Sequence, residues 1–130
     1  MTRAALLQVQ TERMARPFRW GVHDCCLWAA DCVQAQTGTD PAAGLRGAYA
    51  DAVGALRLLR NLGGLRAVAS RAGEPIAPMA AAEGDVGLIP AGKRACLAVC
   101  FGEAWMLAGT HGLVPQPLDR AVAAWRVHRG

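Results

Sequence analysis

The spacing of hydrophobic side chains changes once along this 130-residue chain, close to Glu74-Pro75, and this change constrains the fold more than any other feature. Before it, apolar residues recur three and four positions apart, which is typical of amphipathic helices. The spacing predicts helices at residues 4–14, 25–36, 51–62 and, as a short fourth, 65–71. After it, short apolar segments separated by glycine-containing connections indicate a small antiparallel sheet.

Strands are predicted at residues 85–89, 95–101, 104–108 and 113–117, with a last strand around Trp125-Arg126-Val127 after a short helical turn at 118–124. Helices first and strands second indicate an α+β fold, in which N-terminal helices pack on a small C-terminal antiparallel sheet. The length suits one core, and no repeat or long linker divides the chain. Residues 1–130 are therefore expected to form a single domain.

Composition argues against several classes of protein. No uninterrupted hydrophobic run approaches the roughly 20 residues needed to cross a bilayer, and residues 1–10 lack the pattern of an export signal. The formal charge of +4 comes from scattered arginines that are not interleaved with aromatic residues, so nucleic acid is not expected as a partner. Five cysteines, three of them in one predicted helix, favour free thiols over a disulfide framework.

Cys25 is the candidate nucleophile of this chain. Asp24 is a good N-cap residue and Gly38 a good stop, so Cys25 is expected in the first turn of the helix. Unpaired backbone N–H groups and the helix dipole favour a thiolate there. Asp24 and Trp20 are candidate substrate-binding residues, because Trp20 could wall a cleft beside Cys25. The alternative is that Trp20, like Trp28, Trp105 and Trp125, anchors the core.

Three local patterns carry a resemblance to a known family: Trp20-Gly21 before Asp24-Cys25, Gly84-Asp85-Val86 at the first strand, and Gly102 at the end of the second. With the order of helices and strands, they resemble the NlpC-type cysteine peptidases of the papain-like superfamily. The resemblance implies a papain-like NlpC-type fold and assigns the nucleophile to Cys25, whereas Cys26 points about 100° further round the helix. Asp85 is expected to accept backbone hydrogen bonds at the strand entrance.

The resemblance also implies where a base should stand. A histidine is expected at or next to Cys96, and a polar residue that orients it is expected near Leu107, but neither position carries the required chemistry. His111, in a turn after the third predicted strand, is a candidate base if its loop swings toward Cys25. His23 is a weaker second candidate, because it immediately precedes the capping Asp24 and a role in positioning the turn or packing on Trp20 is favoured. Without a base, amide hydrolysis is expected to be slow.

The other cysteines raise the alternative of a metal site. Cys96 and Cys100 are four apart on a predicted strand and so share a face, and Cys25 or Cys26 could complete a thiolate-rich site. Zinc sites are more often built from close Cys-x-x-Cys pairs. Cysteines acting as small buried hydrophobic residues are therefore expected, with no metal and no cofactor.

A second resemblance is to an uncharacterised family of small proteins encoded in the tail modules of phages and prophages. It rests on Phe18, Trp20-Gly21, His23-Asp24-Cys25, Ala30-Asp31, Gly38-Thr39-Asp40-Pro41, Arg46-Gly47, Tyr49, Gly63-Gly64, Gly84-Asp85-Val86, Val99-Cys100-Phe101-Gly102, Gly112-Leu113, Pro117-Leu118 and Ala124-Trp125-Arg126-Val127. It implies a tail-tip, hub or baseplate protein whose partners are other tail-tip or hub proteins, with peptidoglycan as a further candidate. Such a protein is found in the host cytoplasm during assembly and then in the virion tail.

Two functional hypotheses follow. The first is a structural or assembly component of the tail tip on a degenerate NlpC-like scaffold. The second is an active thiol peptidase that cleaves peptidoglycan stem peptides during genome delivery. The first is favoured because a fold persists more readily than a catalytic constellation. A chaperone needed only during assembly is a third reading.

Overall fold

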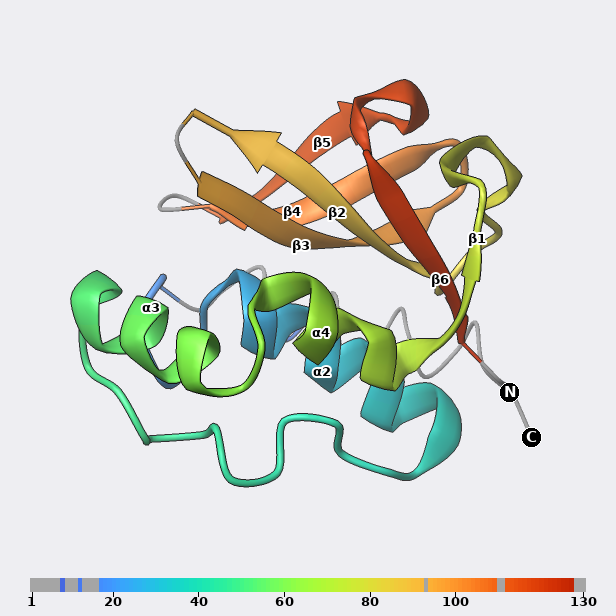
Figure 1. Ribbon diagram of the computed structural model, residues 1–130. Helices are drawn as coiled ribbons and strands as arrows, with labels where there is room; N and C mark the ends of the chain where they lie inside the picture. Colours follow the sequence, from blue (N-terminus) through green and yellow to red (C-terminus); the bar gives the residue numbers. More distant parts are fainter. Residues whose placement is uncertain (1–7, 9–11, 13–16, 93, 110–111, 128–130) are drawn as a thin grey trace.

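The computed structural model describes residues 8, 12, 17–92, 94–109 and 112–127. Its helices form one layer and its sheet a second layer stacked on them (Figure 1). This is the α+β arrangement that the change in hydrophobic spacing predicts. The helix expected at residues 4–14 lies almost entirely outside the described residues. No helix among the described residues has the length and hydrophobicity needed to cross a membrane.

Helix α2 (Cys25–Thr37) is the buried centre of the helical layer and confirms the helix predicted at 25–36. Asp24 Oδ1 accepts a hydrogen bond from the Leu27 N–H at 3.0 Å, which caps the first turn. Gly38 ends the helix in the left-handed conformation, with φ of 80°. The helix packs against strands β3 and β4 and buries Leu27 and Trp28 completely.

Two shorter helices follow, α3 (Ala52–Asn61) and α4 (Leu65–Ala69), which continues as the 3₁₀ turn η1 (Ser70–Ala72). They confirm the helices predicted at 51–62 and 65–71. Asp51 caps α3 by accepting a hydrogen bond from the Gly54 N–H at 2.7 Å. Of the residues of α3, Ala55 is buried, whereas Leu56 stays 46% exposed because the helix lies at the end of the layer (Figure 1).

The described residues form one antiparallel sheet in the order β1-β6-β2-β3-β4-β5. Its strands are β1 (Gly73–Ile76), β2 (Val86–Ala91), β3 (Arg94–Phe101), β4 (Ala104–Gly109), β5 (Gly112–Pro117) and β6 (Ala123–Val127). Two 3₁₀ turns, η2 (Pro78–Ala80) and η3 (Leu118–Arg120), lie between strands. The predicted turn at 118–124 is thus shorter than expected, and the last strand begins earlier, at Ala123.

Strand β1 was not predicted from the sequence. It carries Pro75, which cannot donate to a strand ladder, and it pairs only with β6 at the edge of the sheet. Proline is tolerated at an edge because one side of the strand needs no partner. Asp85 is fully buried and accepts hydrogen bonds from the Ala82 N–H at 2.8 Å and the Val127 N–H at 3.1 Å. It therefore joins the entrance of β2 to the end of β6, as expected.

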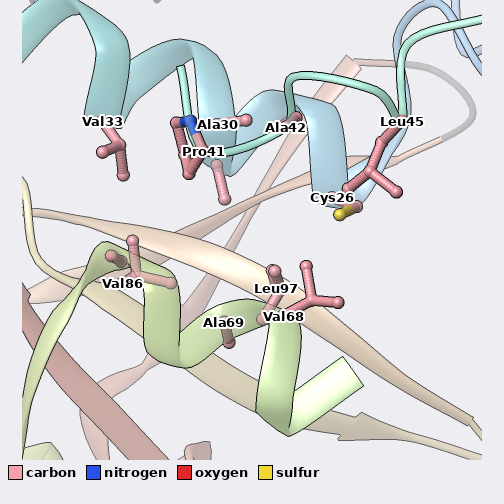
Figure 2. A pocket seen from close by; sticks show the side chains of 12 residues that line it. Cys26, Ala30, Val33, Pro41, Ala42, Leu45, Val68, Ala69, Val86 and Leu97 are labelled. Atoms are coloured by element: carbon pink, nitrogen blue, oxygen red, sulfur yellow. The ribbon is translucent and has the colours of Figure 1, made fainter. Parts of the chain in front are cut away.

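Apolar side chains pack on both faces of the sheet. The larger cluster lies between sheet and helices and includes Trp28 and Trp125, while the smaller cluster surrounds Trp105 on the other face. Trp105 packs directly over Gly87, where a Cβ atom would come within 2.8 Å of the indole ring. A cavity of about 20 Å³ lies in the larger cluster. Figure 2 shows its lining, which includes Cys26 and comes from α2, α4, β2, β3 and the segment with Pro41, Ala42 and Leu45. With no polar groups to bind water, it is a packing gap.

Candidate functional site

Cys25 is the first residue of α2, the helix that packs against β3 and β4. The recorded pairing of these two strands runs from Phe101↔Ala104 to Val99↔Met106. There Trp28 Nε1 of α2 donates a hydrogen bond of 2.9 Å to the Met106 carbonyl, and the Leu97 N–H donates to the Cys25 sulfur. The start of the helix is thus fixed against both strands, and this fixes the position of the thiol.

Cys96 of β3 is hydrogen-bonded to Cys25. This is the position at which the NlpC-type resemblance implies a catalytic histidine. The hydrogen bond to Cys96 raises the pKa of Cys25 well above its ordinary value, and burial adds to the increase. The hydrogen bond from Cys25 lowers the pKa of Cys96 to about 7, with help from the charge of Arg94 and against the effect of burial. The two pKa values shift in opposite directions, so Cys96 is the thiol of the pair that ionises more readily.

Cys26 has a different environment. It is only 8% exposed and borders the small apolar cavity in Figure 2. Burial, with the nearby charge of Asp24, raises the pKa of Cys26 to about 12. A thiol that stays protonated and inaccessible is unreactive, so Cys25 and Cys96 are the cysteines on which chemistry at this site depends.

Asp24 anchors the turn that precedes Cys25. It is 1% exposed, and its Oδ2 atom accepts hydrogen bonds from the Gly21 N–H at 2.9 Å and from the Tyr49 hydroxyl at 2.6 Å. Burial, followed by the hydrogen bond to Asp24, raises the pKa of Tyr49, which therefore remains a donor. Both carboxylate oxygens of Asp24 thus hold the local structure, which makes Asp24 a positioning residue for Cys25.

The backbone at position 21 accepts only glycine. Its φ of 81° lies in the left-handed region, and an added Cβ atom would come within 2.1 Å of the Tyr49 carbonyl oxygen. The segment containing Tyr49 therefore packs directly against the turn before Cys25. Sequence reasoning did not single out Tyr49 as a site residue, because it lies in an irregular segment with no helical or strand spacing around it.

A cleft of about 850 Å³ opens in front of the two thiols. Its apolar wall includes Trp20 and Leu56, and Arg60 and Arg94 bring positive charge to it. The described residues that line it are Trp20, Asp24, Cys25, Cys26, Tyr49, Ala52, Ala55, Leu56, Leu59, Arg60, Gly64, Leu65, Ala91, Arg94, Ala95 and Cys96. The cleft lies between the helical layer and the β2–β3 end of the sheet, and it can hold an extended ligand with an anionic group.

The candidate histidines do not appear among the described residues that line this cleft. His23 is 2% exposed and belongs to a tight turn in which its backbone exchanges two hydrogen bonds of 2.8 Å with Arg19. His111 lies outside the described residues. In the part of the chain that the structure describes, the groups that set the Cys25 pKa are sulfur atoms, a backbone amide and burial.

The condition for a thiolate-rich site, that Cys96 and Cys100 both meet the start of α2, is not fulfilled. Cys96 lines the cleft, whereas Cys100 is fully buried beside Trp105 in the smaller apolar cluster. Alternation gives the face of a strand at each position, but the twist of the sheet decides which element that face meets. Across the residues described, no group of three or more histidine, cysteine or acidic side chains is arranged to hold a metal ion.

Comparisons with known proteins agree with this fold. A solved structure, the crystal structure of the NlpC/p60 domain of peptidoglycan hydrolase SagA, superposes with a TM-score of 0.60 over 95% of this chain and 97% of that one. The two sequences are 16% identical, so the likeness is one of fold. The model of a family described as "Domain of unknown function (DUF6950)" matches residues 2–127. No curated protein sequence matches the chain.

Proposed function

We propose that this chain, which belongs to the DUF6950 family, is a non-hydrolytic protein on an NlpC-like scaffold. Its role is that of a structural or assembly component of a phage or prophage tail tip, hub or baseplate. The observation that carries the non-hydrolytic part is that Cys96, a thiol in place of the expected histidine, lies beside Cys25 in the cleft. The tail-tip part is supported by the residue pattern shared with tail-module proteins.

Amide hydrolysis makes two chemical demands on the residue beside the nucleophile. A thiol peptidase needs an ionised nucleophile and a partner that protonates the leaving amine. An imidazole does both, because it gains the nucleophile's proton and later gives it up. Here the partner is a sulfur that leaves the proton on Cys25. The cleft is therefore suited to binding rather than to turnover.

The lining of the cleft supports a class of ligand. Its apolar wall suits an extended chain, and Arg60 and Arg94 favour a carboxylate. The likeness in fold to a domain of a peptidoglycan hydrolase favours a peptidoglycan-related peptide or a peptide segment of a neighbouring tail protein. In this proposal the protein meets its partners in the host cytoplasm during assembly and then stays in the virion tail.

The alternative is an active thiol peptidase of papain-like type that cleaves peptidoglycan stem peptides during genome delivery. The position of Cys25 favours it, because the thiol stands at a helix start, in an open cleft, with the Leu97 N–H bonded to its sulfur. His111 would then have to supply the base.

A digestion experiment separates the two functions. Wild-type protein, Cys25→Ala and His111→Ala are incubated with purified peptidoglycan, with the NlpC/p60 domain of SagA as positive control, and soluble fragments are analysed by mass spectrometry. We expect none of the three to release fragments. Fragments released by the wild type and lost in Cys25→Ala would overturn the non-hydrolytic role.

The tail-tip role has its own test. The chain is co-expressed with the proteins of a tail module and recovered by affinity purification. Co-purification with a hub protein that survives Cys25→Ala supports an assembly role. Absence of the chain from both assembling and mature tails would contradict it.

A further inference from the structure

Two cysteines of this chain share one accessible cleft. Cys25 and Cys96 are both half-buried and line the same cleft, and a hydrogen bond joins their side chains. The other described cysteines, Cys26, Cys32 and Cys100, are buried. Among the described residues, a reagent in solvent can therefore reach two adjacent thiols at Cys25 and Cys96.

We propose that Cys25 and Cys96 form a redox-active dithiol, which takes a low-molecular-weight disulfide as its oxidant and closes to an intramolecular disulfide. This goes beyond the proposed function and does not depend on it, because both a binding protein and a hydrolase could carry such a pair. The class of oxidant is a small aliphatic disulfide with anionic groups, of which oxidised glutathione is the probe used below.

The reaction balances in two exchange steps. The Cys96 thiolate attacks one sulfur of the small disulfide, so a Cys96–sulfur bond forms, the sulfur–sulfur bond of the reagent breaks, and one small thiolate leaves and takes a proton from water. Cys25 then loses its proton to solvent and attacks the Cys96 sulfur, which releases the second small thiolate. In total, two protein thiols are oxidised and one small disulfide is reduced to two thiols.

The order of attack follows from where the proton lies. Cys96 is the ionised member and has Arg94 beside it, so it is the sulfur able to attack first. Once Cys96 is in the mixed disulfide, its hydrogen bond to Cys25 as a thiolate is lost, and so is its charge, both of which raise the pKa of Cys25 in the reduced pair. The Leu97 N–H then favours the Cys25 thiolate, which is ready to attack.

The charge of the cleft gives the dithiol a preference among small disulfides. Arg60 and Arg94 both line the cleft. An anionic disulfide is attracted to these side chains, whereas a cationic one such as cystamine is repelled. Oxidised glutathione should therefore react faster than cystamine, and the difference should shrink at high salt.

The test uses the full-length, reduced protein at pH 7. It is incubated with oxidised glutathione, quenched with iodoacetamide, digested without reductant and mapped by mass spectrometry. We expect a Cys25–Cys96 disulfide as the main product, with Cys26, Cys32 and Cys100 recovered as thiols. Oxidation spread over all five cysteines, or no disulfide under conditions that oxidise a reference dithiol, would overturn the proposal.

Two variants assign the roles, and their thermal melts check that they fold. Cys25→Ser removes the second attacker, so a glutathione adduct should accumulate on Cys96. Cys96→Ser removes the first attacker together with the sulfur that raises the pKa of Cys25, so this variant can form only a glutathione adduct on Cys25. In the wild type, a short reaction quenched before the disulfide closes should show glutathione on Cys96, and glutathione mainly on Cys25 would contradict the assignment. Release of peptidoglycan fragments by the reduced protein would overturn the proposed function and leave the dithiol untouched.

Discussion

Cys25 and Cys96 line one cleft and are hydrogen-bonded to each other, and this contact raises the pKa of Cys25 and lowers that of Cys96. A helix N-terminus normally favours a thiolate. In this protein the hydrogen bond with Cys96 and the burial of Cys25 raise the pKa of Cys25 above its ordinary value, and the charge of Cys96 adds a smaller contribution. The residue in the nucleophile position is thereby the less reactive member of the pair.

Replacing Cys96 with histidine should restore an activated thiol. An imidazole at this position accepts the Cys25 proton and pairs with the thiolate, so Cys96→His should speed the alkylation of Cys25 at pH 7 by roughly tenfold over wild type. The rate is measured with iodoacetamide and mass mapping. Cys96→Ser is the matched control, since it removes the competing thiolate without adding a base. A Cys25 rate in Cys96→His no higher than in Cys96→Ser would contradict the expected pairing.

Gly21→Ala should unfold the turn before Cys25. The alanine Cβ atom would meet the Tyr49 carbonyl oxygen at 2.1 Å with φ of 81°, so we expect a loss of more than about 3 kcal/mol in the free energy of unfolding. Gly38→Ala is the matched control: φ is 80°, but nothing lies within 4 Å of its Cβ position. That variant should lose about 1 kcal/mol. Chemical denaturation measures both, and equal losses would mean that the close approach to Tyr49 is absent.

Tyr49→Phe removes the hydrogen bond of 2.6 Å to the buried Asp24 carboxylate. Because this bond is made to a charged group, we expect a loss of about 1.5–3 kcal/mol in the free energy of unfolding. The matched control is Ser70→Ala, which removes an exposed hydrogen bond of 2.6 Å to the Ala67 carbonyl and should cost under about 0.5 kcal/mol. Thermal unfolding of both variants tests this. A destabilisation of Tyr49→Phe no larger than that of Ser70→Ala would show that the Tyr49 hydroxyl does not stabilise the Asp24 carboxylate.

Closing the Cys25–Cys96 disulfide should stabilise the fold. The bond would join residues far apart in the sequence, and constraining a loop of that size in the unfolded chain contributes about 4 kcal/mol in the chain-entropy description. The oxidised protein should therefore melt at a higher temperature than the reduced protein, and oxidant should not raise the melting temperature of Cys25→Ser, which cannot close the bond. An oxidised wild type that melts below the reduced form would mean that the native geometry resists the bond.

The regular elements could be predicted from the sequence because each depends on local spacing and caps. Helix α2 is bounded by Asp24 and Gly38, and both residues act as their types predict. Strand β1 was missed because Pro75 argues against a strand until its edge position is known.

The site was less accessible to sequence reasoning. Cys25 was identified from its capped helix, but the hydrogen bond to Cys96 joins residues from two elements and depends on how β3 passes the start of α2. Cys96 and Cys100 were expected to share a strand face, but spacing along a strand does not include the twist of the sheet and so could not decide which of them meets the start of α2. Tyr49 gave no periodic signal, although it is the one tyrosine of the chain.

The most direct measurement is the pH dependence of alkylation at each of the two cysteines. Reduced wild-type protein is treated with limiting iodoacetamide across pH 5–10, and the labelled peptides are counted by mass spectrometry. A lowered pKa leaves the thiolate present above that value, so labelling of Cys96 should rise through about pH 7, while labelling of Cys25 should lag to well above its ordinary range. Labelling of Cys25 ahead of Cys96 at neutral pH would contradict the proton arrangement on which the non-hydrolytic role and the dithiol both depend.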